Sequence, residues 1–139
     1  MKKEISKSEQ IAIIYHKAIT SGDFEKVREV SSPDLVFEDP TAPQGLIPAR
    51  IEGQDAVIAF YKEALPKVEK EIQITHSFES NNYVVLHQNI KGITDVSDFG
   101  QEGGKIEFQL PGIAVLYIVD GLVTHYIDYL DYTDIMSKM

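Results

Sequence analysis

The spacing of apolar residues changes once along this chain of 139 residues, and that change limits the folds open to it. Up to about residue 65, apolar side chains recur every three or four residues, which is the period of an amphipathic helix. Beyond residue 70 they alternate with polar side chains, as in strands with one buried face. The expected helices cover residues 7–21, 24–30 and 54–65, and the expected strands cover residues 34–39, 72–78, 83–91, 105–119 and 122–131.

Helices followed by a run of strands predict an α+β fold. The four later strands are expected to form an antiparallel meander, which the early strand joins to give a mixed sheet. The length fits a single domain over residues 1–139 with one core. Within the long strand at 105–119, Pro111-Gly112 predicts a bulge or a strong bend.

Composition excludes several classes of function. The net charge of −9 opposes phosphate backbones and anionic lipids, so neither nucleic acid nor a membrane is an expected partner. The absence of cysteine excludes thiolate metal sites and cysteine nucleophiles. The N-terminal residues lack the apolar stretch of a signal peptide, and no segment approaches the roughly 20 apolar residues of a membrane span. We therefore expect a cytoplasmic protein.

Asp39 is a carboxylate in an unusual position. In the strand at 34–39 it shares a face with Leu35 and Phe37, and Pro40 stops the strand from continuing. Burial disfavours a charged carboxylate and raises its pKa, which suits the group to accept a proton from a weakly acidic substrate. The alternative is that Asp39 only forms a turn or a cap before the proline.

A second aspartate lies in the closing strand. Tyr126, Asp128 and Leu130 share one face of that strand, and His125 lies on the other. Asp128 is therefore either a pocket residue or, in so acidic a chain, a solvated one.

The remaining histidines are weaker candidates. His76 alternates in phase with Ile72 and Ile74, so we expect it to form part of a pocket wall. His16 lies off the apolar stripe of its helix and is expected at the surface. The four histidines form no paired or clustered spacing, and no glycine-rich phosphate loop follows a strand. We expect no metal and no cofactor.

Several stretches together resemble the nuclear transport factor 2-like superfamily, and within it the ketosteroid isomerases and SnoaL-like polyketide cyclases. They are Tyr15 with Gly22-Asp23 behind it, residues 36–40 (VFEDP), residues 51–61 (IEGQDAVIAFY), and residues 121–123 (GLV) leading into the closing strand. The resemblance spans most of the chain and implies a cone-shaped, bent sheet wrapped around three helices with a pocket inside.

The resemblance also implies roles for individual residues. Asp39 occupies the position of the general base of ketosteroid isomerases, and Tyr15 that of a donor to the enolate oxygen. A second donor, a protonated aspartate, is replaced here by Ala114, and Asp128 is the best substitute. Related epoxide hydrolases need an Arg and an Asp near residues 86–89, which read LHQN, so that chemistry is disfavoured.

We therefore expect a small enzyme that isomerises, cyclises or dehydrates an apolar, carbonyl-bearing molecule by proton transfer beside the carbonyl. The alternatives are a non-catalytic binding module for an apolar ligand, and a dimeric interaction protein with a vestigial cavity. A homodimer through the outer face of the sheet is expected, as the resemblance also implies. The residues expected to line the pocket are Phe37, Phe60, His76, Leu116, Tyr126 and Leu130.

Overall fold

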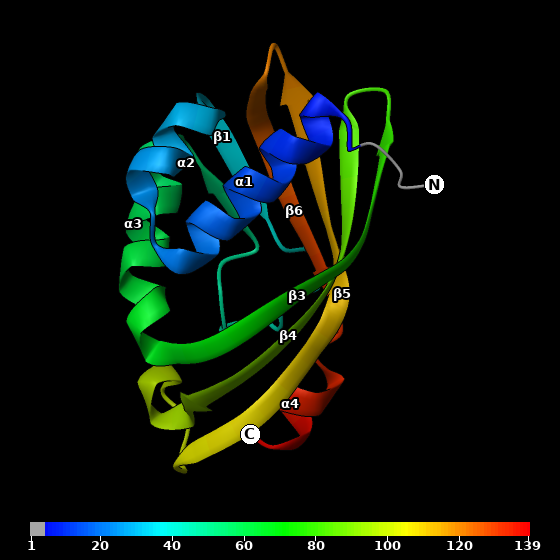
Figure 1. Ribbon diagram of the computed structural model, residues 1–139. Coiled ribbons are helices and arrows are strands. Elements are labelled where there is room, and N and C mark those ends of the chain that lie inside the picture. Colours follow the sequence, from blue (N-terminus) through cyan, green and yellow to red (C-terminus); the bar gives the residue numbers. More distant parts are fainter. Residues whose placement is uncertain (1–4) are drawn as a thin grey trace.

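The computed structural model describes residues 5–139 and contains one six-stranded sheet with helices packed on it (Figure 1). The helices are α1 (Lys7–Ser21), α2 (Phe24–Val30), α3 (Gln54–Ala64) and α4 (Thr133–Ser137), with short 3₁₀ turns η1 (Leu65–Lys67) and η2 (Val96–Phe99). The strands are β1 (Ser31–Glu38), β2 (Arg50–Glu52), β3 (Val68–Ser80), β4 (Tyr83–Asp95), β5 (Lys105–Val119) and β6 (Leu122–Leu130).

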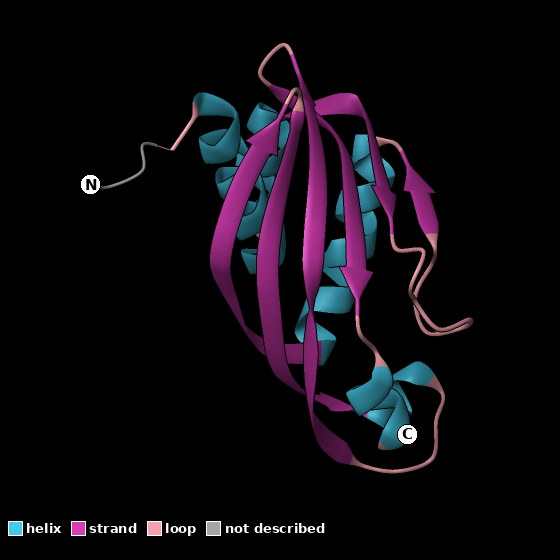
Figure 2. Ribbon diagram, turned by 90° about the vertical axis from the view of Figure 1, so that its right-hand side faces the viewer, coloured by secondary structure: helices cyan, strands magenta, loops and turns pink. Residues whose placement is uncertain are grey.

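The sheet is open and mixed, with the strand order β2-β1-β6-β5-β4-β3. All neighbouring strands are antiparallel except β1 and β6, which run parallel. Helices α1 to α3 cover one face, and the other face carries no helix over most of its length (Figure 2). The α+β fold expected from the sequence, with a bent sheet wrapped around the helices, is confirmed.

Local signals place the first two helices. The Ser6 side chain accepts a hydrogen bond from the Glu9 amide, and Gly22 ends α1 in the left-handed conformation, with φ of 85°. The Asp23 side chain accepts from the Lys26 amide and so starts α2. Two further elements were not expected. They are β2, which pairs with the end of β1, and α4, which packs against β5 at the lower end of the sheet.

The face predicted for His76 is wrong. A β-bulge between Ile74 and His76 shifts the register of β3 against β4, so the alternation inverts beyond it. As a result Ile72 and Ile74 face the helices, whereas His76 and Phe78 are exposed on the outer face. His76 is therefore not part of an interior wall; its ring contacts that of His87 on the neighbouring strand.

No bulge interrupts β5 at Pro111-Gly112. The pairing with β4 runs unbroken through both residues, and the strand curves there without a break (Figure 1). Gly112 is required for a different reason: a Cβ atom at this position would lie 2.1 Å from the Tyr129 carbonyl oxygen of β6. Close approach of two strands, rather than a register shift, accounts for the glycine.

The interior divides into two packed regions. The larger lies between the three long helices and the upper sheet, and the smaller lies between α4, the 40–49 loop and the lower ends of the strands. Within residues 5–139, no helix has the length and apolar character needed to cross a membrane.

Candidate functional site

A buried polar cluster lies between the helices and the sheet, where the two packed regions meet. The end of β1 contributes Asp39, β6 contributes Tyr126 and Asp128, and the helices contribute Tyr15 and Tyr61. Burial raises the pKa of all three tyrosines, and the charge of Asp128 adds to the rise; burial also raises the pKa of Asp128, with a smaller contribution from the charge of Asp39. The structure therefore brings together Tyr15, Asp39 and Asp128, three residues that are far apart in the sequence.

Asp39 is fully buried and well supplied with donors. Its Oδ1 accepts from the Thr41 amide at 3.1 Å and from the Thr41 hydroxyl at 2.7 Å, and its Oδ2 accepts from the Tyr132 hydroxyl. The Thr41 hydroxyl also accepts from the Leu130 amide at 2.9 Å. Asp39 thus forms the turn after β1 and ties it to the end of β6 and to the start of α4.

Asp128 is held differently. Its Oδ1 accepts from the Gln88 amide nitrogen at 2.9 Å, and the Tyr126 side chain forms a second hydrogen bond to it. Burial raises the pKa of Asp128 to about 7, despite the opposing effect of these two bonds, and the charge of Asp39 adds to the rise. A carboxyl with a pKa near neutrality can both accept and return a proton under physiological conditions.

His16, expected at the surface, is instead only 1% exposed. Its Nε2 lies 2.8 Å from the Gln88 Oε1, which completes a chain from His16 through Gln88 to Asp128. Since the Gln88 amide nitrogen donates to Asp128, its oxygen must accept, so His16 donates through Nε2–H. Burial lowers the pKa of His16, which favours the neutral imidazole that this chain requires.

Gln88 was missed at the sequence level, although a signal for it existed. It alternates in phase with Val84 and Leu86 in β4, and all three side chains are fully buried. A glutamine on the apolar face of a strand needs a hydrogen-bonding partner, and only the packing of α1 on β4 shows that His16 supplies it.

The three interior tyrosines remain protonated. Burial raises the pKa of Tyr15, Tyr61 and Tyr126. Tyr126 already forms a hydrogen bond to Asp128, so the Tyr15 and Tyr61 hydroxyls are the candidates to donate to a developing negative charge. The rings of Tyr15 and Tyr126 lie 5.5 Å apart. Ala114, where the related isomerases have a second donor, pairs directly opposite Asp128 in the β5–β6 ladder. Cross-strand neighbours lie about 5 Å apart at Cβ, so Asp128 projects beside the position that Ala114 leaves without a polar group.

The other expected pocket residues are mostly packed against one another. The Phe37 ring lies 6.1 Å from those of Phe60 and Tyr126, and Leu116 is buried in the same core. Leu130 belongs to the smaller core below them.

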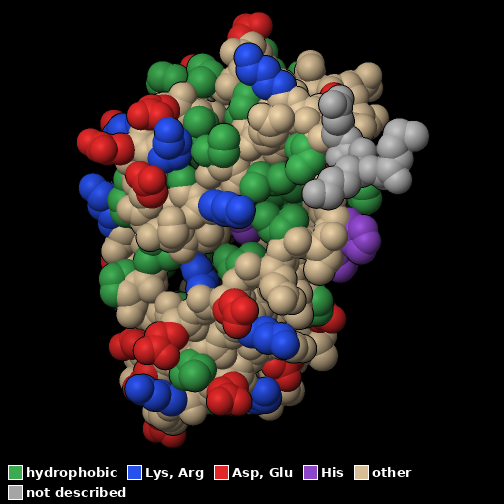
Figure 3. Space-filling view, in the orientation of Figure 1, with side chains coloured by type: hydrophobic (Ala, Val, Ile, Leu, Met, Phe, Trp, Pro, Cys, Tyr) green, Lys and Arg blue, Asp and Glu red, His purple; other side chains and the backbone are tan. Residues whose placement is uncertain are grey.

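Two hollows flank the cluster. A groove of about 510 Å³ lies between α1 and β3, with His16 in its wall, and Figure 3 shows a recess at this place. A smaller, almost wholly apolar cavity of about 130 Å³ lies under α4, and Tyr132 forms part of its wall. Among the described residues no group of three or more His, Asp or Glu side chains could hold a metal ion.

The fold and this acidic, tyrosine-rich interior define a class of small, cone-shaped α+β proteins with a polar cluster inside. The sequence pattern of the SnoaL-like domain matches residues 14–126, and this chain belongs to that family. No curated protein matches the chain.

Solved structures with the same fold agree with this family assignment. A protein described as a SnoaL-like polyketide cyclase from Shewanella putrefaciens CN-32 is 25% identical, with 96% of each chain covered and a TM-score of 0.81. One of the same description from Shewanella denitrificans OS-217 is 27% identical over 94% of each chain, with a TM-score of 0.79. An NTF2-like protein from Burkholderia xenovorans LB400 is 17% identical over 98% of each chain, with a TM-score of 0.78, and shares the fold.

Proposed function

We propose that this protein is a cofactor-independent enzyme that moves a proton next to the carbonyl group of a small, apolar molecule, in the manner of an isomerase or a polyketide cyclase. The observation that carries the proposal is Asp128, a buried carboxyl with a pKa of about 7 that is placed among tyrosine hydroxyls. The family and the description of its relatives as polyketide cyclases support the same type of reaction.

Two aspartates are candidates for the base, and their surroundings favour Asp128. Asp39 has no exposed surface and its carboxylate already accepts three hydrogen bonds, whereas Asp128 keeps 8% of its surface accessible. A base must reach the proton that it removes. The role of Asp39 as the base, which the resemblance implies, stays a prediction. Asp39 also has a second role, because its negative charge raises the pKa of Asp128 further.

The reaction would proceed in two proton transfers. The Asp128 carboxylate takes a proton from the carbon beside the carbonyl, and the electron pair of the broken C–H bond moves to the carbonyl oxygen as an enolate. A tyrosine hydroxyl, with Tyr15 the candidate, donates a hydrogen bond to that oxygen. Protonated Asp128 then returns the proton to another carbon. In a cyclisation, the enolate carbon instead attacks a second carbonyl within the same molecule, and protonated Asp128 gives its proton to the alkoxide that forms.

A non-catalytic binding module remains the second candidate. It is favoured by the replacement of the second oxyanion donor by Ala114 and by the close packing of Phe37, Phe60 and Leu116, which leaves the cluster little room. On this view the same interior would hold an apolar ligand without reacting with it.

Exchange of the α-protons of 2-tetralone in D₂O, followed by NMR, tests the proposal without knowledge of the natural substrate. Wild type should accelerate the exchange, and Asp128→Asn should lower the rate by about 100-fold or more, as expected for loss of a general base. Asp131→Asn, at an exposed position just beyond β6, is the control and should behave as wild type. Loss of exchange in Asp39→Asn but not in Asp128→Asn would make Asp39 the base. Binding of 2-tetralone without exchange would support the binding module.

The protein is further proposed to act in the cytoplasm as a homodimer that associates through the outer face of its sheet. Aromatic side chains gather there: Tyr83 and Tyr129 are exposed, and the centre of the Tyr83 ring lies 4.7 Å from that of Tyr117. A second subunit would cover these exposed rings and remove their apolar surface from water.

A further inference from the structure

The groove between α1 and β3 has a basic character that the proton-transfer chemistry does not require. It continues into a second hollow of about 360 Å³, and the two share Lys17, Thr20 and Ile72 in their walls. Lys70, on β3, lines the second hollow. Two lysines at one opening contrast with the net charge of −9 of the whole chain.

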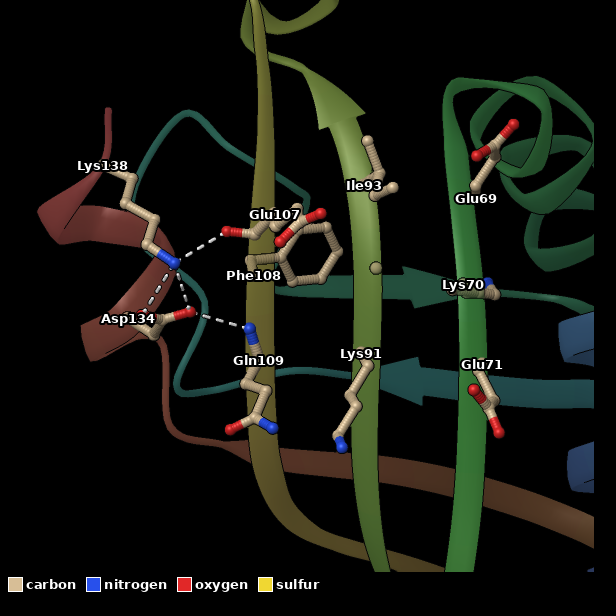
Figure 4. Close-up of a pocket in the computed structure, with 11 residues that line it drawn as sticks. Glu69, Lys70, Glu71, Lys91, Ile93, Glu107, Phe108, Gln109, Asp134 and Lys138 are labelled. Atoms are coloured by element: carbon tan, nitrogen blue, oxygen red, sulfur yellow. Dashed lines mark hydrogen bonds and ion pairs between the residues drawn. The ribbon is translucent and has the colours of Figure 1, made fainter.

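Lys70 points into the molecule rather than away from it. Figure 4 shows Glu69, Glu71 and Lys91 on the outer side of β3 and β4, with Lys70 directed behind its strand. Its side chain is half-buried, and it alternates in phase with Ile72 and Ile74, which face the helices. An ammonium group is seldom placed so without a counter-charge.

No carboxylate neutralises either lysine. Among residues 5–139, no acidic side chain lies within ion-pair distance of Lys17 or Lys70. The same holds for Lys7, Lys62, Lys91 and Lys105, whereas Lys26, Lys67, Lys138, Arg28 and Arg50 form ion pairs. Asp128 is near enough for its charge to act on Lys70, but it makes no ion pair with it. The charges of both lysines also act on His16, whose pKa they help to lower. The groove therefore carries a positive field over its wall.

The rest of the wall is apolar. Ile13 of α1 faces Ile72 and Ile74 of β3 across the groove, and His16 connects this wall through Gln88 to Asp128. A ligand that fits would carry one anionic group for Lys70 and Lys17 and an apolar body for the isoleucines. His16 and Gln88 lie between this ligand and the proposed base, Asp128.

We propose that this groove binds the carboxylate group of the substrate, with Lys70 as the principal contact and Lys17 at the rim, so that the substrate is an apolar carbonyl compound that also carries a carboxylic acid. The carbonyl group of this substrate follows from the proposed function, whereas the carboxylate group is inferred from the groove alone. Lys70 is thereby assigned as a specificity-determining residue.

Binding of 2-naphthoate, an apolar carboxylate with no exchangeable α-proton, tests this assignment by calorimetry or NMR. Wild type should bind 2-naphthoate at least about tenfold more tightly than Lys70→Gln does, because an ion-assisted contact is lost. The neutral analogue 2-naphthol should bind both proteins alike. Inorganic phosphate, which has no apolar body, should compete only weakly.

Lys91→Gln is the matched control, because Lys91 is a strand lysine on the neighbouring strand that points to the opposite side of the sheet. It should bind 2-naphthoate as wild type does. Equal affinity of wild type and Lys70→Gln for 2-naphthoate, or no binding by wild type, would overturn the proposal. An equal loss of 2-naphthol binding in Lys70→Gln would also overturn it, by showing that Lys70 only supports the fold.

Failure of the proposed function gives a different pattern. If 2-tetralone shows no Asp128-dependent exchange while 2-naphthoate still binds through Lys70, the carboxylate site stands and the base assignment falls. If exchange depends on Asp128 and 2-naphthoate binding ignores Lys70, the enzyme acts on neutral substrates.

Discussion

At the scale of the residue, Asp128 shows how burial creates reactivity at a cost in stability. The folded protein binds a proton at this carboxyl more tightly than the unfolded chain does, because its pKa rises from the usual 3.8 to about 7. Below the lower value both states are protonated, and the group imposes no penalty on folding. As the pH rises from about 4 to about 7, the unfolded chain releases this proton while the folded protein still holds it, so stability falls across that window and levels off above about 7.

Asp128→Asn should therefore change the pH dependence of unfolding. At pH values above about 7 the variant should be more stable than wild type, by up to about 4 kcal/mol for a shift of about three pKa units. Near pH 5 the difference should be less than half as large, because this pH lies only about one unit above the unfolded pKa of 3.8. Urea denaturation from pH 5 to 8.5 measures both values. A stability difference that stays constant over this range would show that Asp128 does not titrate there.

At the scale of the element, the curved strands meet most closely where β5 passes β6. Gly112 pairs with Leu130, and the Tyr129 carbonyl occupies the space that any larger residue would need. This contact fixes the end of β6, which lies next to Asp128 and just before Tyr132, the donor to Asp39.

Gly112→Ala should destabilise the protein by about 3 kcal/mol or more, because the added methyl group meets backbone that cannot rotate away. Gly104→Ala is the control: no atom lies within 4 Å of the Cβ it would gain, and its φ lies outside the left-handed region. Chemical denaturation of both variants measures the contrast. Equal stability of the two would mean that β5 and β6 separate easily at this point.

At the scale of the whole molecule, the sheet is covered on one face by three helices and bears aromatic side chains on the other. Burial of such side chains against a second copy would stabilise a dimer through the removal of apolar surface from water.

Sedimentation should show wild type as a dimer at micromolar concentration and Tyr129→Lys as a monomer. Ile14→Lys is the matched control, because both side chains are 42% exposed and Ile14 lies on α1, away from the outer face of the sheet. It should remain a dimer. A monomeric wild type, or a dimer that survives Tyr129→Lys unchanged, would contradict association through this face.

Sequence by itself determined the fold class, the local signals that begin and end the first helices, and the apolar strand face on which Asp39 lies; it left open whether Asp128 is buried or solvated. These properties depend on periodicity and capping within one element, which neighbouring residues fix locally. The same reasoning could identify Asp39 as unusual, but not the Thr41 and Tyr132 donors that surround it.

Tertiary structure alone decided the rest. The bulge in β3 directs His76 to the outer face. The packing of α1 on β4 places His16 within hydrogen-bond distance of Gln88, and the start of α4 places the Tyr132 hydroxyl against Asp39. Packing also buried Asp39 completely, whereas Asp128 keeps 8% of its surface exposed, and it left Lys70 without a carboxylate at the groove. Periodicity fixes the direction of a side chain relative to its own element. The groups that face that side chain belong to other elements, and these groups set its pKa and its access to a substrate.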